Sequence, residues 1–387
     1  MRQLVKCKLR KPMKIIHLAD THLGYSAYRK VSERGFNQRE EDINAAFIQA
    51  IDKIIELKPE IVLHCGDLFD AVRPSNRILH LALSQILRLI QAKIKVIIIS
   101  GNHDTPKQRY LGSVFSIFEV LPIQSNQLWI AHKGCYEKIG LDGMTIHALP
   151  QCPSPEQFEQ ELAKITLDPN TKNILMLHAG TKGMQEFSHG DFNELLIDSR
   201  YLEKPFDYIA LGHYHGQVQV GKGAYYSGST ERLSFNEVNR AKGFLEINLD
   251  QGSRPVFHEL KIRPMIEIPF INAQGLDSIA LMAAIEKGIQ SIDPQGKIAR
   301  AKATNISSDV YGSLDFKKIS AWTSAATHFE LIFEKADENI KTESMGTAIR
   351  GLREEYLSYI NNLADLDEEK KKELINSGLS YLNQVME

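Results

Sequence analysis

The chain of 387 residues is poor in cysteine, has no long apolar run and carries no strong net charge. Its four cysteines show no CxxC spacing and are expected to be reduced thiols of a cytoplasmic protein. Cys65, at the end of an expected strand, is predicted to be a small buried thiol. No apolar run approaches the ~20 residues that cross a bilayer, so no membrane partner is expected. The formal net charge of −2 gives no general attraction to polyanions, which local basic groups would have to hold.

Five short apolar runs each end at a residue that can bind a metal. The runs are rich in Ile and Val, which is typical of strands buried on both faces. The motifs that follow them are Asp20-Thr21-His22, Gly66-Asp67, Gly101-Asn102-His103-Asp104, His178 and Gly212-His213-Tyr214-His215. Because ligands in open α/β sheets collect beyond the carboxyl ends of the strands, we expect these side chains to meet at one edge.

Amphipathic helical patterns separate the first of these runs. Glu40–Leu57 carries apolar residues at three-to-four spacing, and Asn76–Gln91 repeats the pattern. The alternation predicts a layered α/β domain over residues 13–262, an α/β/β/α sandwich with helices covering the sheets. Short runs after His215 are expected to be antiparallel strands that complete the second sheet.

Three segments lie outside this domain. Residues 1–12 are basic but lack the apolar stretch of a signal peptide, so we interpret them as an extension and Met13 as the natural start. Residues 263–340 are predicted to form a small α+β domain. Residues 345–387 carry helical stripes on a segment too short to bury them alone. These helices either pack on their own domain or receive a partner's helix.

The motif residues are carboxylates, imidazoles and one amide, without thiolate. Such a set suits Mn²⁺, Fe²⁺ or Zn²⁺ in a catalytic rather than a structural site. Two cations about 3.5–4 Å apart need a bridging anion, and Asp67, which follows a glycine at a strand end, is the expected bridge. His213 and His215 are two residues apart in extended chain, so each can serve one metal. The pattern therefore predicts a two-metal hydrolase.

In the order DxH, GD, GNHD, H and GHxH, these motifs resemble the calcineurin-like metallophosphoesterases. Within that family the chain is similar to the SbcD-type nucleases of DNA double-strand-break repair. Further segments that resemble this branch are Gly24-Tyr25, Gln38-Arg39-Glu40, Arg73-Pro74-Ser75, Gly228-Ser229-Thr230-Glu231-Arg232 and Arg263-Pro264. The resemblance is specific from Met13 to about Arg263 and diffuse through Glu334. The branch's small DNA-capping domain begins at Arg263-Pro264.

The resemblance also implies a role for each motif residue. It implies one metal held by Asp20, His22, Asp67 and His215, and a second held by Asp67, Asn102, His178 and His213. It further implies that His103 is catalytic without ligating a metal, and that Asp104 orients its ring. One departure is Asp70, which stands three residues after the bridging aspartate, where some relatives carry a histidine.

A function follows from the same resemblance. It implies a Mn²⁺-dependent nuclease with 3′-to-5′ exonuclease activity on double-strand ends and endonuclease activity on single strands. It also implies a homodimer and a complex with an SbcC-type coiled-coil ATPase, docked at the C-terminal helices. Two alternatives stay open: a phosphodiesterase or phosphatase acting on a small ester, and a non-catalytic DNA-end scaffold. Basic loops and the extra segments favour the nuclease, and the complete ligand set disfavours the scaffold.

Basic residues recur after the first three metal motifs, on the edge where a phosphate backbone would lie. Such contacts position DNA without reading its sequence and make binding strongly salt-dependent. Scattered solvated charges are the alternative interpretation. The candidates are Arg29, Lys30, Arg39, Arg73, Lys107 and Arg109.

Two further histidines, His17 and His64, lie inside expected strands. A histidine within a buried strand is more often a hydrogen-bonded core residue than a ligand. We therefore leave both out of the metal site.

Overall fold

The computed structural model describes residues 13–108, 111–123, 126–141, 143–182, 194–249, 254–335, 360, 370–372 and 374–379. The chain divides into two units, Met1–Lys335 and Ala336–Glu387. The expected N-terminal extension lies outside the described residues, as does most of the expected helical segment at 345–387; its described residues are helical. Within the described part, no helix is both long and apolar enough to span a membrane.

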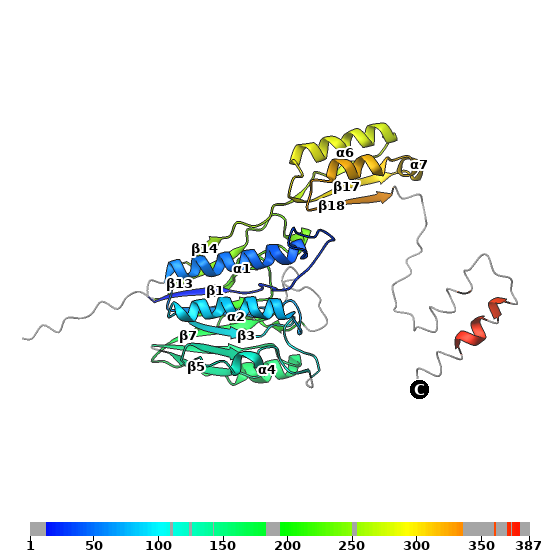
Figure 1. Cartoon of the computed structure of the whole chain (residues 1–387). Helices are drawn as coiled ribbons and strands as arrows, with labels where there is room; N and C mark the ends of the chain where they lie inside the picture. The colour runs from blue at the N-terminus through cyan, green and yellow to red at the C-terminus, as the bar shows by residue number, and fades with distance from the viewer. Residues whose placement is uncertain are drawn as a thin grey trace, which may run out of the picture. The chain divides into compact units, whose positions relative to one another are not determined.

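Two six-stranded sheets form the body of the first unit (Figure 1). The first consists, in spatial order, of β14 (Val256–Glu259), β13 (Gly243–Asn248), β1 (Lys14–Leu18), β2 (Ile61–Cys65), β3 (Lys95–Ile99) and β4 (Leu128–Ala131). The second consists of β11 (Val218–Gly221), β12 (Ala224–Tyr226), β10 (Tyr208–Gly212), β7 (Lys172–His178), β6 (Met144–Leu149) and β5 (Glu137–Leu141). Five strands carry the motifs. In the first sheet, β2 pairs in parallel with both β1 and β3, and in the second sheet β7 pairs in parallel with β10.

Helices cover the outer face of each sheet, while the inner faces pack on one another. On the first sheet lie α1 (Gln38–Leu57) and α2 (Asn76–Gln91), and their buried residues share a core with β1, β2 and β3. On the second lie α4 (Pro155–Ala163) and α5 (Ser199–Leu202). Figure 1 shows α1 and α2 on one side and α4 on the other. The α/β/β/α sandwich is therefore confirmed, with an apolar core between its sheets.

Helix α1 shows how the sequence sets these boundaries. The side chain of Asn37 accepts hydrogen bonds from the backbone N–H groups of Arg39 and Glu40, which satisfies donors at the helix start. Lys58 adopts a left-handed conformation with φ 51°, and its N–H reaches back to the last turn. Between these ends, the apolar side chains lie on the face that packs on the first sheet.

The short strands after His215 depart from the expectation. Only β11 and β12 join the second sheet, and β12 pairs with β10 in parallel. Strand β13 instead pairs antiparallel with β1, and β14 with β13, so both extend the first sheet. The prediction that all of these runs complete the second sheet is wrong, because a local apolar pattern indicates a strand but does not choose its partner.

Residues 263–335 form a layer of parallel strands covered by helices. The strands are β15 (Met265–Glu267), β16 (Ile271–Asn272), β17 (Ile298–Ile306) and β18 (His328–Lys335). The helices are α6 (Ser278–Ile292), α7 (Ser308–Gly312) and α8 (Phe316–Thr323). The last two were not expected from sequence. Leu281 and Ile285 of α6 and Ile319 of α8 share a core with β17.

Smaller elements complete the first unit. They are α3 (Ser116–Glu119), β8 (Gly180–Thr181), β9 (Leu196–Ile197) and the 3-10 turn η3 (Phe235–Glu237). Strands β8 and β9 pair with one another in parallel. The turn η3 places the acidic residue Glu237 next to His215.

His17 and His64 are buried core residues, as their place in the strands predicts. The ring nitrogens of His17 lie 3.0 Å from the Tyr208 hydroxyl and 3.2 Å from the Leu211 carbonyl. One ring nitrogen of His64 lies 3.1 Å from the Thr21 hydroxyl. Burial lowers the pKa of each imidazole to about 3, so both are neutral in the folded protein near pH 7.

We expect the free energy of unfolding to decrease as the pH falls below about 6.5. In the unfolded chain His17 binds a proton near that pH, whereas in the fold it stays neutral until about pH 3. The unfolded state then binds more protons, and stability is lost at about 1.4 kcal/mol per pH unit for each such site. Urea unfolding at pH 7, 6 and 5 measures the slope, which His17→Asn should make shallower. An unchanged slope in that variant would contradict the neutral buried state.

Candidate metal centre

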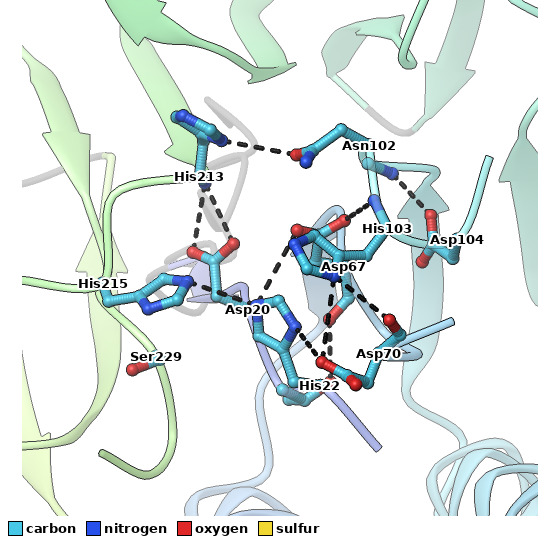
Figure 2. A network of polar contacts seen from close by, with 12 residues as sticks. Asp20, His22, Asp67, Asp70, Asn102, His103, Asp104, His213, His215 and Ser229 are labelled. Carbon is cyan, nitrogen blue, oxygen red and sulfur yellow. Dashed lines mark hydrogen bonds and ion pairs between the residues drawn. The ribbon is translucent and has the colours of Figure 1, made fainter. Parts of the chain in front are cut away.

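The five motifs meet at one place, beyond the carboxyl ends of β1, β2, β3, β7 and β10. Figure 2 shows residues of four of these motifs close together. Among the described residues, three overlapping groups of side chains have donor atoms that lie within 4.8 Å of one another inside each group. These groups are Asp20 with His22 and His215, Asp20 with Asp67 and His178, and His22 with Asp67 and His103. The structure thus brings side chains from both sheets together although almost two hundred residues separate Asp20 from His215 along the chain.

The side chains expected for the first metal face one another. The Nε2 atoms of His22 and His215 are 3.2 Å apart, and His22 Nε2 lies 3.7 Å from an Asp67 carboxylate oxygen. Two imidazole nitrogens at that distance cannot both present a lone pair to the other without repulsion. A cation between them satisfies both, so this donor set fits a metal ion.

The side chains expected for the second metal form an adjoining set. His178 Nε2 lies 3.2 Å from Asp67 Oδ2 and 2.9 Å from the side-chain oxygen of Asn102. His213 Nδ1 lies 3.4 Å from the same Asn102 oxygen. Asp67 Oδ2 is also the atom that faces His22, so this carboxylate stands between the two sets. That is the position a bridging ligand requires.

The backbone is bent sharply at the points that aim these side chains. Asp20, His22, Asp67 and His213 all have positive φ, at 52°, 45°, 52° and 102°. Non-glycine residues rarely adopt such angles, and they collect at functional sites where the surrounding structure holds them. At the ends of β1, β2 and β10, these backbone turns direct the ligand residues toward the centre.

Two glycines let the strand ends of the two sheets approach closely. A Cβ atom on Gly66 would lie 2.2 Å from His178 Nδ1. A Cβ atom on Gly212 would lie 1.8 Å from the Cys65 carbonyl oxygen. Any side chain at either position would push the second sheet's ligands away from Asp67.

Each of the four ligand-type histidines has its other ring nitrogen held by an oxygen. The partners are Asp70 for His22 (3.2 Å), the Cys65 carbonyl for His178 (2.8 Å), Glu194 for His213 (2.8 Å) and Glu237 for His215 (3.0 Å). Such contacts fix the tautomer and the ring orientation, so that one nitrogen faces the metal. Sequence reasoning missed Glu194 and Glu237, because neither follows a strand end.

The electrostatics of the centre call for positive charge. Burial raises the pKa of Asp67, but the adjacent His178 and His22 outweigh it and hold the pKa well below its usual range. Burial likewise lowers the pKa of His178, but Asp67 and Asp20 raise it to about 9. The buried carboxylates thus draw protons onto neighbouring imidazoles. Divalent ions satisfy the same carboxylates, in exchange for those protons.

His103 lies beside these sets and is partly exposed. Its backbone N–H donates to Asp67 Oδ1 at 2.9 Å, and its ring stands edge-on to His22 with centroids 4.7 Å apart. Its Nδ1 is 3.1 Å from the backbone carbonyl of Asp70 and 3.8 Å from that residue's carboxylate. Asp70 therefore orients both His103 and His22.

The expectation that Asp104 orients the His103 ring is wrong. The Asp104 carboxylate is buried and accepts backbone N–H bonds from Gly101 at 2.7 Å and Leu68 at 2.9 Å. Adjacent residues in a tight turn point in different directions, and the carboxylate ties the second motif's loop to the third. Burial, with repulsion from Asp67, raises the pKa of Asp104 to about 7.

The expected DNA-contacting residues do not all reach the surface. Arg29, Lys30, Arg73 and Lys107 are exposed beside the metal motifs, and Arg109 lies outside the described residues. Arg39 is 1% exposed, so its prediction as a DNA contact is corrected. The sequence could not show that acidic residues within the fold take up this guanidinium.

Arg39 belongs to an internal ion network instead. Its guanidinium lies 2.9 Å from Asp42 and 3.7 Å from Glu231. Asp42 also accepts two hydrogen bonds from Arg263, at 2.6 and 2.7 Å, and Arg263 in turn donates to the Gly296 carbonyl. This network joins α1 to the segment that leads into residues 264–335.

A sequence model described as calcineurin-like phosphoesterase matches residues 13–217, more than half of the chain. A DNA double-strand break repair protein Mre11 from Methanococcus maripaludis is 32% identical over 247 residues, or 60% of this chain and 62% of that protein. One from Sulfolobus acidocaldarius is 27% identical over 393 residues, or 97% of this chain and 89% of that protein.

The coverage differs among the similar proteins. In the match to M. maripaludis, and in a similar match to Methanocaldococcus jannaschii, the chain spans about three fifths of the relative's length. A solved dimetal phosphatase from Danio rerio aligns at a TM-score of 0.38 and 13% identity, covering 62% of this chain and 93% of its own. A structural similarity with so low a TM-score supports no conclusion about this protein.

We expect Glu194→Gln to weaken metal binding at the set that contains His213. The amide cannot hold the ring nitrogen as an ionised carboxylate does, and losses of about 10–100-fold in metal affinity are usual for such contacts. Titration of metal-stripped protein by calorimetry measures the change. Glu203→Gln, at an exposed position, is the matched control. Equal affinities in the two variants would remove Glu194 from the centre.

Proposed function

Because this chain belongs to the calcineurin-like phosphoesterase family, we propose that it is a metal-dependent nuclease that hydrolyses the phosphodiester bonds of DNA. The observation that carries the proposal is the convergence of donor atoms from both sheets around Asp67. Relatives named as DNA double-strand break repair proteins support DNA as the substrate.

The side chains present can hold two ions and act on a phosphodiester. A pair of divalent ions there supplies Lewis acidity and an activated water. Asp67 keeps the two donor sets together, and His103 sits at the partly exposed edge of the centre. With its Nδ1 directed at the Asp70 carbonyl, His103 has Nε2 left for the substrate. A proton on that atom can stabilise the phosphoryl charge or pass to the departing oxygen.

The ion and the reaction can be specified further. Oxygen and imidazole donors without thiolate suit Mn²⁺, Fe²⁺ or Zn²⁺, and we take Mn²⁺ as the ion because the motifs resemble those of SbcD-type nucleases. We take the activities to be 3′-to-5′ exonuclease on double-strand ends and endonuclease on single strands, in a cytoplasmic enzyme. These assignments rest on the likeness of the motifs to SbcD-type nucleases.

The proposed partners rest on the same likeness. They are DNA ends, an SbcC-type coiled-coil ATPase bound through the segment at 345–387, and a second copy of this chain. The near-complete coverage of the Sulfolobus relative supports carrying the whole arrangement over. Arg29, Lys30, Arg73 and Lys107 remain the proposed contacts to the DNA backbone, together with Arg109.

The decisive experiment is digestion of end-labelled duplex DNA across Mn²⁺, Mg²⁺, Zn²⁺ and Fe²⁺, with bis-p-nitrophenyl phosphate and cyclic nucleotides assayed in parallel. We expect Mn²⁺-dependent shortening of the duplex, lost on chelation and in Asp67→Ala, because that variant lacks the carboxylate between the two donor sets. Hydrolysis of a small ester without any DNA cleavage would assign the centre to a different phosphodiesterase. If no substrate is hydrolysed with any of these metals, the proposal that the protein is a metal-dependent nuclease is wrong.

We expect His103→Asn to keep the metals and lose turnover. The side chain is partly exposed and its removal leaves the oxygen partners of the other histidines in place, whereas general acid–base help is typically worth about 10²–10⁴-fold in rate. Elemental analysis after dialysis gives the metal content, and single-turnover cleavage gives the rate. A variant that releases its metals would show that His103 is a ligand instead.

A further inference from the structure

Lys242 is a buried lysine next to the metal centre, immediately before β13. Its side chain is 0% exposed, and its ammonium donates to the His215 carbonyl at 2.7 Å, Ser229 Oγ at 2.8 Å and Glu237 Oε2 at 2.6 Å. An ammonium group has three donors, and all three are used here. Because desolvating a charged amine is costly, a fully satisfied buried lysine indicates a specific structural task.

These contacts reach His215 from both ends. At the backbone, Lys242 binds the His215 carbonyl directly. At the ring, it binds one oxygen of Glu237, whose other oxygen lies 3.0 Å from His215 Nδ1. Figure 2 places Ser229, the third acceptor, beside His215. The ring's opposite nitrogen, Nε2, is the one that faces His22 in the donor set of the first metal.

We propose that Lys242 is a positioning residue for the metal centre. It holds the Glu237 carboxylate against His215 Nδ1, so that Nε2 of the same ring is presented to the metal in the required tautomer. The Leu233 N–H also donates to Glu237 Oε2, at 3.2 Å, but a neutral amide cannot balance the carboxylate's charge. The ammonium balances it and fixes its direction.

The placement of Lys242 also links the two sheets at the centre. His215 follows β10 of the second sheet, whereas Lys242 immediately precedes β13 of the first. The Lys242 carbonyl accepts from the Leu260 N–H at 2.8 Å, and the next residue, Gly243, donates to the Ser229 carbonyl at 3.3 Å. The ammonium therefore reaches the second sheet's ligand from a backbone anchored in the first. The inference rests on the two-metal centre of the proposed function, but not on DNA as the substrate.

The test is Lys242→Met, which keeps most of the unbranched side chain and removes the charge. Metal-stripped protein is titrated with Mn²⁺, and free Mn²⁺ is followed by electron paramagnetic resonance. We expect one of the two ions to bind about 10–100-fold more weakly and the other to be unchanged. Saturating Mn²⁺ should then restore hydrolysis of bis-p-nitrophenyl phosphate. The Mn²⁺ concentration that gives half-maximal activity should therefore rise, whereas kcat should stay unchanged. Lys222→Met, at an exposed lysine, is the matched control.

A double-mutant cycle separates positioning from a general structural role. If Lys242 acts through Glu237, then adding Lys242→Met to Glu237→Gln should cost little further Mn²⁺ affinity. Additive losses would overturn the proposal, as would unchanged affinity in a folded Lys242→Met protein. Should the methionine variant fail to fold by circular dichroism, Glu237→Gln alone carries the test, and unchanged affinity there would overturn the proposal. If the unmodified protein binds Mn²⁺ and hydrolyses the ester but does not cleave DNA, the proposed DNA substrate is wrong and the inference about Lys242 is unaffected.

Discussion

Two buried carboxylates, Asp20 and Asp67, lie at the point where the ends of both sheets meet, and their charge is the constraint on which the site depends. An ionised carboxylate in a buried position is costly unless positive charge accompanies it. The imidazoles of His178 and His22 approach these groups closely enough to supply it as protons, which is why the pKa of His22 is raised and that of His178 is raised to about 9. Divalent ions meet the same need with stronger and directional bonds. The positive φ angles and the two tightly packed glycines are the backbone's means of bringing the charges together.

Charged side chains surround the metal-donor histidines: carboxylates contact the histidine rings, and Lys242 contacts one of those carboxylates. Each ligand-type imidazole turns its second nitrogen to an oxygen, and three of those oxygens belong to carboxylates outside the strands, two in loops and one in η3. One of them, Glu237, is itself neutralised by Lys242. The negative charge that a metal needs nearby is therefore fixed in direction before an ion arrives. Such preorganisation lowers the cost of assembling the donors around it.

The sequence allowed the inner part of the site to be predicted, because one local rule covers it. Strand ends are visible as apolar runs, and the carboxyl ends of parallel strands share an edge, so the motif residues could be expected to meet. The outer part follows no such rule. Glu194, Glu237 and Lys242 are polar residues in or beside irregular segments, and only the tertiary fold shows what they face. The prediction of Arg39 as a DNA contact was wrong for the same reason, since one of its buried ion-pair partners, Glu231, lies far along the chain. The prediction that β13 joins the second sheet was also wrong, because an apolar run does not determine which strand it pairs with.

Asp70 shows how one position can serve two residues by separate means. Its backbone carbonyl holds His103, and its carboxylate holds His22. The first contact belongs to the main chain and survives any side chain that leaves the loop in place. The second needs an acceptor of suitable length. A histidine at this position would therefore keep the orientation of His103 but leave the Nδ1 of His22 to another partner. The aspartate thus couples His22 to His103, and the identity of this residue bears on the orientation of the His22 ring more directly than on that of His103.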